Sequence, residues 1–431
     1  MSLLPEELPR RCWLAHASVP PDLLDKAAPG RVSVLLEDGR IAAVESAPLG
    51  DAPVFDLRGA ALLSAFVDPH THLDKGDLLA AGLKVERNLF RAIDAVHADC
   101  GRWTALELRA RMGFALRSAL AHGTRALLSY ADWSAPDGPL AWRVLQELRD
   151  EWQGRIELLP TSLATIDLLA DPVQAEALGR AVAAARGVLG IFVYPSPHVA
   201  ALIPAAFDLA ERFDLRLDFH VDEHLAPAIA NLPVVARLAR ERGYGARTVC
   251  GHACLLSAMT DAERDHTLDV VAEAGIALVC LPYTNLHLQD SSAAPPLTTP
   301  RRRGLLPVHE ARARGIDVAF GSDNHRDPFF PAGDLDPLQT LALAALAAQL
   351  DDAVPCWAAA VTRTPAERLG LAWDGVLRPG APADLVLHPG RNSAEVLSRP
   401  AVGRVVLRAG QRLSVADATL PDFRELDDLR A

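Results

Sequence analysis

The chain alternates between short apolar runs and longer amphipathic segments. Eight runs rich in Val, Ile, Leu and Phe are too short for helices and are typical of buried strands. They cover residues 61–67, 125–130, 155–160, 188–193, 215–219, 247–250, 277–281 and 317–320. Helix-length amphipathic segments lie between most of them, at residues 105–122, 139–152, 172–186, 232–243 and 262–275. Eight strands that alternate with helices predict an α/β fold, a (β/α)8 TIM barrel.

A doubly wound open sheet is the alternative for the same alternation of strands and helices. Such sheets usually carry a Gly-rich phosphate loop after the first strand, and this chain has none there, which favours the barrel. Residues 336–350 and 356–369 have the pattern of helices that close the barrel. Residues 341–350 are rich in Ala and Leu and fit either a core helix or the interface of a homo-oligomer.

Both ends of the chain have the pattern of short strands joined by turns. Residues 31–44 predict a hairpin with an Asp-Gly turn. Three more strands are predicted near the C-terminus, at residues 383–387, 402–407 and 411–413. We expect residues 1–60 and 375–431 to form one small β-sandwich domain, while residues 61–374 form the catalytic barrel.

Composition and charge narrow the classes of partner. The 431 residues carry 43 basic and 55 acidic side chains, which gives a formal net charge of −12. This acidity argues against nucleic acid as a partner, since a phosphate-binding face needs a cationic surplus. No apolar stretch approaches the roughly 18 residues of a membrane span, and the N-terminus lacks the layout of a signal peptide. The six cysteines form no CxxC pair, so we expect reduced thiols and a cytoplasmic protein.

The segment AFVDPHTHLDK places His70 and His72 after the first predicted strand. Side chains two apart on extended backbone point the same way, so these imidazoles form half of a candidate metal site. Two histidines hydrogen-bonded in a turn are the structural alternative. The carboxyl ends of barrel strands carry catalytic residues in this fold, and this position favours the metal site.

The segment RLDFHVDEH follows another predicted strand and offers His220 as a third imidazole. Glu223 lies shortly after it, where a carboxylate moves protons for a metal-activated water in many hydrolases. Asp222 and His224 are competing candidates, and a solvated helix start is the structural alternative.

Two more predicted strands end in His252, in TVCGHAC, and Asp323, in DVAFGSDNHRDPF. A lone histidine after a strand is usually structural, and a polar run is often a surface loop. With the other strand-end histidines, however, they complete a set of imidazoles and a carboxylate that suits Zn²⁺ or Fe²⁺.

These motifs also give the chain a family resemblance. HTHLDK, HVDE, GHA, PYTNLHLQ, GSDN and PGAPADLVL occur in the order found in the amidohydrolase superfamily. The chain most resembles the cytosine deaminase group and related enzymes that remove amines from triazine rings such as N-isopropylammelide. The resemblance covers nearly the whole chain and implies one divalent metal ion, Zn²⁺ or Fe²⁺, in the barrel mouth. The ligands that it implies are His70, His72, His220 and Asp323.

The resemblance further implies a reaction. The metal lowers the pKa of a bound water toward about 7, and the resulting hydroxide attacks a ring carbon that bears an exocyclic nitrogen. Glu223 then carries protons from the water to the substrate. His252 stabilises the developing oxyanion, and Asp323 accepts a proton from the attacking water.

Relatives with two metals usually bridge them with a carboxylated lysine at the end of strand four. Here that strand ends IFVYPSPH, without a lysine, which favours a single metal. Lys75 follows the first histidine pair and is a candidate substrate contact. Its pairing with Asp74 or Asp77 is the structural alternative.

Two departures from the resemblance bear on the substrate. Cytosine deaminases carry a Gln after strand three that reads the pyrimidine amide edge, whereas this chain has PTSLATID, with Ala164 as the candidate contact. They also have Asp-Asp where this chain has Asp-Asn, and Asn324 donates as well as accepts hydrogen bonds. Both departures argue against cytosine as the substrate. Further candidate substrate contacts are Arg326, Tyr283 and Asn285. A surface pair between Arg326 and Asp327 is the structural alternative.

The sequence thus predicts a metal-dependent hydrolase that deaminates a small nitrogen heterocycle. The alternative within enzymes is hydrolysis of a cyclic or acyclic amide without deamination. A binding protein that kept the barrel and lost turnover is the alternative outside enzymes, and the intact ligand set with Glu223 argues against it.

Overall fold

The computed structural model describes residues 4–26, 30–133, 138–196, 198–291, 297–427 and 429. The chain divides into two compact units. Unit 1 comprises Met1–Asp68, Arg117–Ala126 and Asp336–Pro421, and unit 2 comprises Pro69–Leu116, Leu127–Leu335 and Asp422–Ala431. Unit 1 takes in residues 336–374, which we assigned to the barrel domain, so the domain limits drawn from the sequence stay a prediction.

An eight-stranded sheet runs in the order β13-β12-β11-β10-β9-β8-β7-β6. Its strands are β6 (Phe66–Thr71), β7 (Thr124–Asp132), β8 (Glu157–Thr165), β9 (Leu189–Val193), β10 (Leu217–Val221), β11 (Thr248–His252), β12 (Ala277–Cys280) and β13 (Val318–Phe320). Strands β8 to β13 pair in parallel. A parallel bridge between Thr71 and Asp323 links the two ends of the sheet. The predicted (β/α)8 barrel is thereby confirmed.

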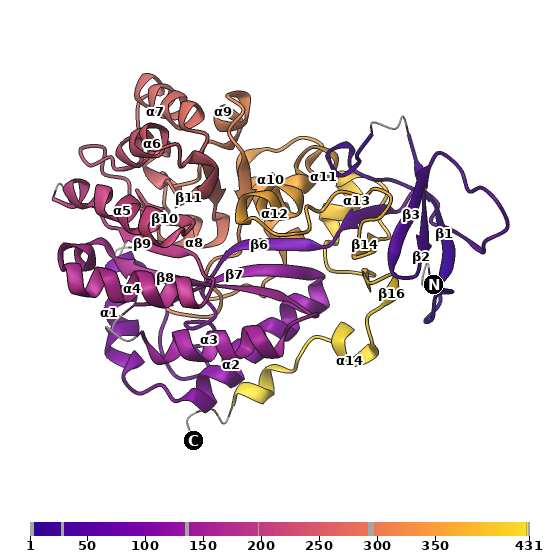
Figure 1. Cartoon of the computed structure of the whole chain (residues 1–431), viewed down its shortest axis with the longest axis horizontal. Helices are drawn as coiled ribbons and strands as arrows, with labels where there is room; N and C mark the ends of the chain where they lie inside the picture. Colours follow the sequence, from indigo (N-terminus) through magenta and orange to yellow (C-terminus); the bar gives the residue numbers. More distant parts are fainter. Residues whose placement is uncertain are drawn as a thin grey trace. The chain divides into compact units, whose positions relative to one another are not determined.

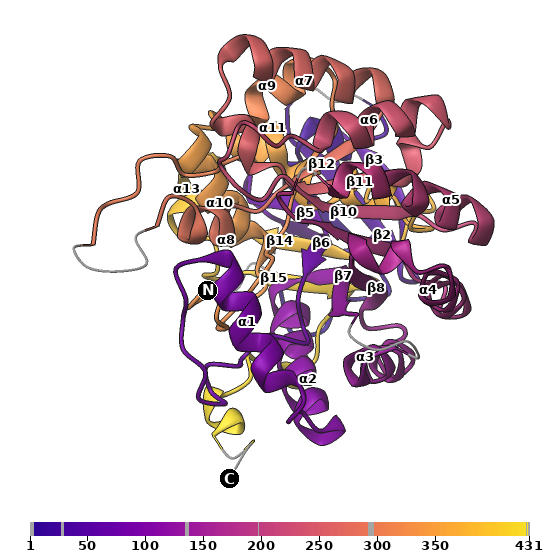
Figure 2. The ribbon, with the colours of Figure 1, turned by 90° about the vertical axis from the view of Figure 1, so that its left-hand side faces the viewer.

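Helices follow the strands along the chain, and α3 to α7 lie outside strands β7 to β11 (Figure 1 and Figure 2). They are α1 (Leu89–Cys100), α2 (Ala105–His122), α3 (Leu140–Glu151), α4 (Pro172–Ala184), α5 (Ile203–Phe213), α6 (Leu232–Glu241), α7 (Asp261–Ala274), α8 (Pro282–Leu288) and α9 (Val308–Ala313). Local signals fix their ends. A capping box between Thr260 and Glu263 starts α7, and left-handed Gly275 ends it. Because helices cover the barrel, β6, β10, β11 and β12 are buried at every position.

Unit 1 contains two four-stranded sheets, in the orders β3-β2-β1-β4 and β16-β15-β14-β5. Their strands are β1 (Arg11–Ala17), β2 (Val32–Glu37), β3 (Arg40–Glu45), β4 (Val54–Asp56), β5 (Ala61–Ser64), β14 (Leu385–His388), β15 (Val405–Arg408) and β16 (Gln411–Arg412). Its later helices are α10 (Pro337–Ala348), α11 (Ala353–Trp357), α12 (Arg363–Leu369), α13 (Ser393–Ser398) and α14 (Val415–Ala418). Strand β14 pairs antiparallel with β5, so both ends of the chain build this small β domain, as predicted.

The prediction of one strand over residues 61–67 is wrong. Strand β5 ends at Ser64, and β6 begins the barrel at Phe66. The Ala65 amide between them donates to the Asp384 carbonyl. Both strands are buried on both faces, and an unbroken apolar run reads the same whether it enters one sheet or two. Among the described residues, no helix is long and apolar enough to cross a membrane.

Candidate active site

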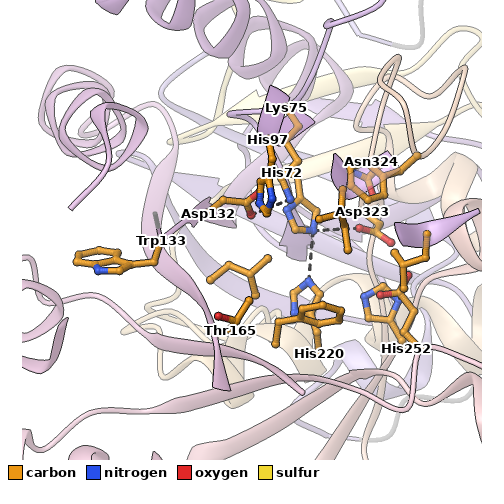
Figure 3. A pocket seen from close by; sticks show the side chains of 16 residues that line it. His72, Lys75, His97, Asp132, Trp133, Thr165, His220, His252, Asp323 and Asn324 are labelled. Carbon is orange, nitrogen blue, oxygen red and sulfur yellow. Dashed lines mark hydrogen bonds and ion pairs between the residues drawn. The ribbon is translucent and has the colours of Figure 1, made fainter. Parts of the chain in front are cut away.

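The barrel brings four of the predicted site residues into contact. His72 Nε2 lies 3.3 Å from His220 Nε2 and 3.3 Å from Asp323 Oδ1. His70 Nε2 lies 3.6 Å from the same carboxylate oxygen. All four side chains are buried. Figure 3 shows His72, His220 and Asp323 pointing toward one another, so these three side chains converge.

This cluster has the chemistry of a metal site. Burial lowers the pKa of His70, His72 and His220 well below the usual value, which keeps these imidazoles neutral, as metal ligands must be. Among the described residues, none donates a hydrogen bond to either carboxylate oxygen of Asp323. A buried carboxylate without donors is costly, and facing imidazole lone pairs repel, so a cation between them satisfies both. The residues therefore fit a divalent metal ion.

Two residues of the site have strained backbone. His252 has φ of 69° and Asp323 has φ of 62°, both in the left-handed region that costs free energy for residues with a side chain. The Asp323 amide donates to the His70 carbonyl at 2.8 Å, which holds this conformation at the end of β13. This left-handed backbone conformation changes the direction of both side chains close to the ends of their strands.

Glu223 and His252 lie beside the cluster. His252 Nδ1 is 3.5 Å from Glu223 Oε1. Burial and the nearby Asp323 charge raise the pKa of Glu223 well above its usual value, which favours the protonated carboxyl group. Burial lowers the pKa of His252 to about 4. The Asn285 amide nitrogen, which only donates, lies 3.0 Å from His252 Nδ1, so the neutral ring carries its proton on Nε2.

Lys75 makes an ion pair in the same pocket. Its Nζ lies 2.8 Å from Asp132 Oδ1. Burial alone would lower the pKa of Lys75, but the carboxylates of Asp132 and Asp74 raise it overall, so the ammonium stays charged. The Phe329 ring faces Nζ at 5.2 Å. The sequence offered Asp74 or Asp77 as the partner of Lys75, but the residue that forms the ion pair is Asp132.

Lys75, Glu223 and His252 are among the residues that line a cavity of about 210 Å³. At about 30 Å³ per water, this space suits a small molecule rather than a single water. Its polar lining includes His72, His220, His252, Glu223, Asp323 and the Lys75–Asp132 pair. Its apolar lining is formed by Leu89, Ile93, Trp133, Leu163, Phe192 and Phe329. Apolar walls with a few convergent polar groups are typical of sites for small ligands.

Comparison with known proteins identifies the fold and its chemistry. Residues 142–413 match the family model of the amidohydrolase family. The chain is 36% identical over 402 residues to a pterin deaminase of Rhizobium rhizogenes, covering 92% of this chain and 90% of that protein. The chain belongs to the amidohydrolase family. The predicted resemblance and the predicted enzyme class, a hydrolase of carbon–nitrogen bonds other than peptide bonds, are confirmed.

Solved structures of similar fold cover almost the whole chain of this amidohydrolase. A 5-methylcytosine deaminase from Klebsiella pneumoniae superposes with a TM-score of 0.79 at 24% identity, over 94% of this chain and 97% of that one. An N-isopropylammelide isopropylaminohydrolase from Burkholderia multivorans gives 0.74 at 25% identity, over 95% and 100%. The fold of this chain, a barrel and a small β domain, is thus shared with these relatives.

Four predicted substrate contacts lie outside the lining of the pocket. Ala164 is fully buried in β8, where its neighbours Leu163 and Thr165 line the cavity. Arg326 binds Asp77, with Nε 2.5 Å from Oδ1. The other two are Asn285, which contacts His252, and Tyr283, whose ring packs on Phe330. Arg326 and Asp327 do not form the surface pair that was the structural alternative. Arg326 binds Asp77, and Asp327 accepts from the Asn324 amide at 2.7 Å.

Several lining residues escaped the sequence analysis. Asp132 and Trp133 stand at the end of β7, a strand-end position like those of the histidines, and that position was the signal that could have found them. His97 on α1 also lines the pocket. Thr165 ends β8 and Phe192 lies in β9, and neither carries a sequence pattern that marks a pocket residue.

Proposed function

We propose that this amidohydrolase deaminates a planar, amino-substituted nitrogen heterocycle of the pterin class. The likeness to a pterin deaminase over 92% of the chain carries the proposal. The sequence had predicted a deaminase for a ring other than cytosine, and the present proposal names that ring class. Release of an alkylamine from a triazine is the second candidate, because a relative of that activity shares the fold at 25% identity.

The pocket supports a flat substrate. Trp133, Phe192 and Phe329 supply aromatic faces and edges around the cavity, and planar rings pack well against such groups. We assign the Lys75–Asp132 pair and Asn324, which line the pocket, to the edge of the substrate ring. Lys75 donates to a ring carbonyl, Asp132 accepts from a ring N–H, and Asn324 does either.

One divalent ion, Zn²⁺ or Fe²⁺, would be held by His70, His72, His220 and Asp323. When bound, it supplies Lewis-acid activation of water at neutral pH. The choice between the two metals belongs to the same proposal, since both accept imidazole and carboxylate ligands.

The remaining residues carry out the proton transfers and the stabilisation. Water adds to the ring carbon that bears the amino group, while Glu223 delivers a proton to the adjacent ring nitrogen and takes up the proton that the water releases. The Nε2–H of His252 donates to the oxygen on which negative charge develops. The tetrahedral carbon then forms its carbonyl, the hydroxyl proton passes through Glu223 to the amino group, and the carbon–nitrogen bond breaks to release ammonia.

Ammonia release from the metal-loaded protein tests the proposal. The panel contains pterin, cytosine, isocytosine, an aminotriazine, N-isopropylammelide and a cyclic amide, with free amines and ring opening of the amide assayed in parallel. We expect ammonia from pterin, at a rate that is about 10²- to 10⁴-fold lower for the Glu223→Gln variant with its metal retained. Isopropylamine from N-isopropylammelide without ammonia from pterin would favour the second candidate. Hydrolysis of cyclic amides alone would return the amide alternative, and silence with a full metal equivalent would favour a binding protein.

We also retain two expectations about the surroundings of the enzyme. Six cysteines without a disulfide support a cytoplasmic location. The side chain of Leu346 on helix α10 is 80% exposed, and a second copy of the chain in a homo-oligomer would cover it. Sedimentation of the purified protein measures the latter.

A further inference from the structure

Tyr130 on β7 contacts three of the imidazoles of the site. Its side chain is fully buried. The distances between ring centroids are 4.6 Å to His70, 4.9 Å to His72 and 4.5 Å to His220. The Tyr130 ring stacks on His72 with an interplanar angle of 28° and meets the other two edge to face. A single side chain that no motif singled out thus lies behind the whole histidine cluster.

The hydroxyl group of Tyr130 makes a directed pair of hydrogen bonds. It donates its proton to Asp218 Oδ1 at 2.7 Å, and it lies 3.0 Å from His70 Nδ1. A phenol has one proton, so the second bond must run the other way, with His70 Nδ1–H donating to the phenol oxygen. The neutral His70 ring then has its lone pair on Nε2, the atom that faces Asp323 Oδ1 at 3.6 Å.

Two glycines restrict the position of the His70 side chain. A Cβ atom at Gly251 would lie 2.9 Å from His70 Cε1, and one at Gly321 would lie 2.9 Å from His70 Cβ. Both distances are shorter than side-chain contacts allow, so only glycine leaves room for this ring. The backbone therefore sets where His70 lies, and the Tyr130 hydroxyl sets which nitrogen holds the proton.

We infer that Tyr130 and Asp218 are positioning residues that fix the tautomer and orientation of His70 for metal binding. Asp218 is fully buried on β10, two positions before His220, and among the described residues nothing donates to its second oxygen. A buried carboxylate with one donor costs stability, which a purely structural role does not explain. Hydrogen bonds to the remote nitrogen of a ligating histidine orient the ring and raise its basicity. This inference rests on the metal ligands assigned under the proposed function.

The test measures metal affinity in the full chain. The metal-free protein is titrated with Zn²⁺ against a chromophoric chelator, for the wild type and for Tyr130→Phe, which keeps the ring contacts and removes only the hydroxyl. We expect binding weaker by about 10- to 100-fold, as for other lost partners of ligating histidines. Asp218→Asn should weaken binding by a similar factor.

Tyr244→Phe is the matched control. Tyr244 is also buried, and its hydroxyl donates to the Leu215 carbonyl instead of a site residue. It therefore loses a buried tyrosine hydrogen bond without touching the cluster, and its Zn²⁺ affinity should equal that of the wild type. The visible absorption of the Co²⁺-loaded protein gives a second readout, because it follows ligand geometry: Tyr130→Phe should shift it and Tyr244→Phe should not.

The outcomes separate this inference from the assignment of the ligands. If His72→Ala abolishes Zn²⁺ binding while Tyr130→Phe binds within twofold of the wild type and keeps the Co²⁺ spectrum, the positioning role is wrong and the ligand set stands. If His72→Ala retains full affinity, the ligand set fails, and the inference fails with it. Equal losses in Tyr130→Phe and Tyr244→Phe would also overturn it, since the effect would then be one of stability.

Discussion

Two aspartates, one in each unit, are buried to the same degree but treated in opposite ways. Asp336 of unit 1 accepts from the Arg404 guanidinium at 2.8 Å and from the Leu338 amide at 3.1 Å, where it caps α10. Asp323 of unit 2 has no donor to its carboxylate among the described residues and instead faces the nitrogens of His70 and His72. One carboxylate is satisfied within the protein, and the other is not.

The difference separates a stabilising charge from a functional one. Burying a carboxylate is costly unless hydrogen bonds and an opposite charge offset the lost hydration. Unit 1 supplies both to Asp336 through Arg404 and the helix terminus. At Asp323 the fold leaves the cost uncompensated and adds backbone strain, which is reasonable only where a cation completes the site. The same substitution, Asp to Asn, tests both positions.

The largest effect is expected from Asp323→Asn. The amide keeps the shape but removes the negative charge that a divalent ion needs, so turnover should fall by at least ~10³-fold and the metal should be lost on dialysis. In the metal-free protein, the melting temperature should match or exceed that of the wild type, because an uncompensated buried charge is gone. Full metal content in the variant would contradict the assignment of Asp323 as a ligand.

Glu223→Gln sharpens the distinction between holding a metal and moving a proton. Glutamine cannot deliver a proton to the ring nitrogen, so kcat should fall by about 10²- to 10⁴-fold. Metal content, measured by elemental analysis of the same sample, should equal that of the wild type. Loss of the metal together with activity would make Glu223 part of the metal site instead.

Asp336→Asn should lower stability instead of activity. Breaking a buried ion pair leaves Arg404 without its charge partner, and the free energy of unfolding at neutral pH should fall by about 3 kcal/mol. Urea unfolding followed by circular dichroism measures it. The kcat per folded molecule should stay that of the wild type, in contrast to Asp323→Asn.

The pH dependence of this penalty follows from the pKa of Asp336. Burial alone would raise that pKa, but the Arg404 and His122 charges lower it overall from 3.8. A lowered pKa in the folded state means that the carboxylate stabilises the fold above pH 3.8 and that this stabilisation is lost as the pH falls through the folded-state value. The difference between the wild type and Asp336→Asn should therefore be full at pH 7 and shrink as the pH falls below 3.8. A penalty that is constant with pH would show that charge is not its cause.

Phe192→Ala should have the smallest effect and should fall on binding. It removes an aromatic wall of the pocket that lies 6.5 Å from the His220 ring but bears no proton or ligand atom. Loss of its buried apolar area should raise KM for pterin by about 10-fold and leave kcat within a few-fold. Leu238→Ala on the outer helix α6 is the comparison variant, since Leu238 does not line the pocket.

Part of the site could be predicted because, in a barrel, a residue at the carboxyl end of a strand lies at the mouth where the other strands also end. His70, His220, His252 and Asp323 each follow or end an apolar strand, and the carboxyl ends of parallel strands meet at one mouth. Asp132 ends β7 in the same way, but a single acidic residue in a strand does not indicate which residue it will pair with. Lys75 lies 57 positions from Asp132 in the numbering, and only the closed barrel brings them to 2.8 Å.

The sequence by itself determined the alternation of strands and helices, the small β segments at both ends, and the residues able to bind a metal, because each depends on local periodicity or residue type. Tertiary structure alone decided which neighbours face one another. It placed Tyr130 behind three imidazoles, set Leu163 and Thr165 rather than Ala164 in the pocket, and split residues 61–67 between two sheets. The physical reason is that hydrogen bonding, stacking and charge compensation act over a few ångströms between residues far apart in the chain, and no local pattern records those distances.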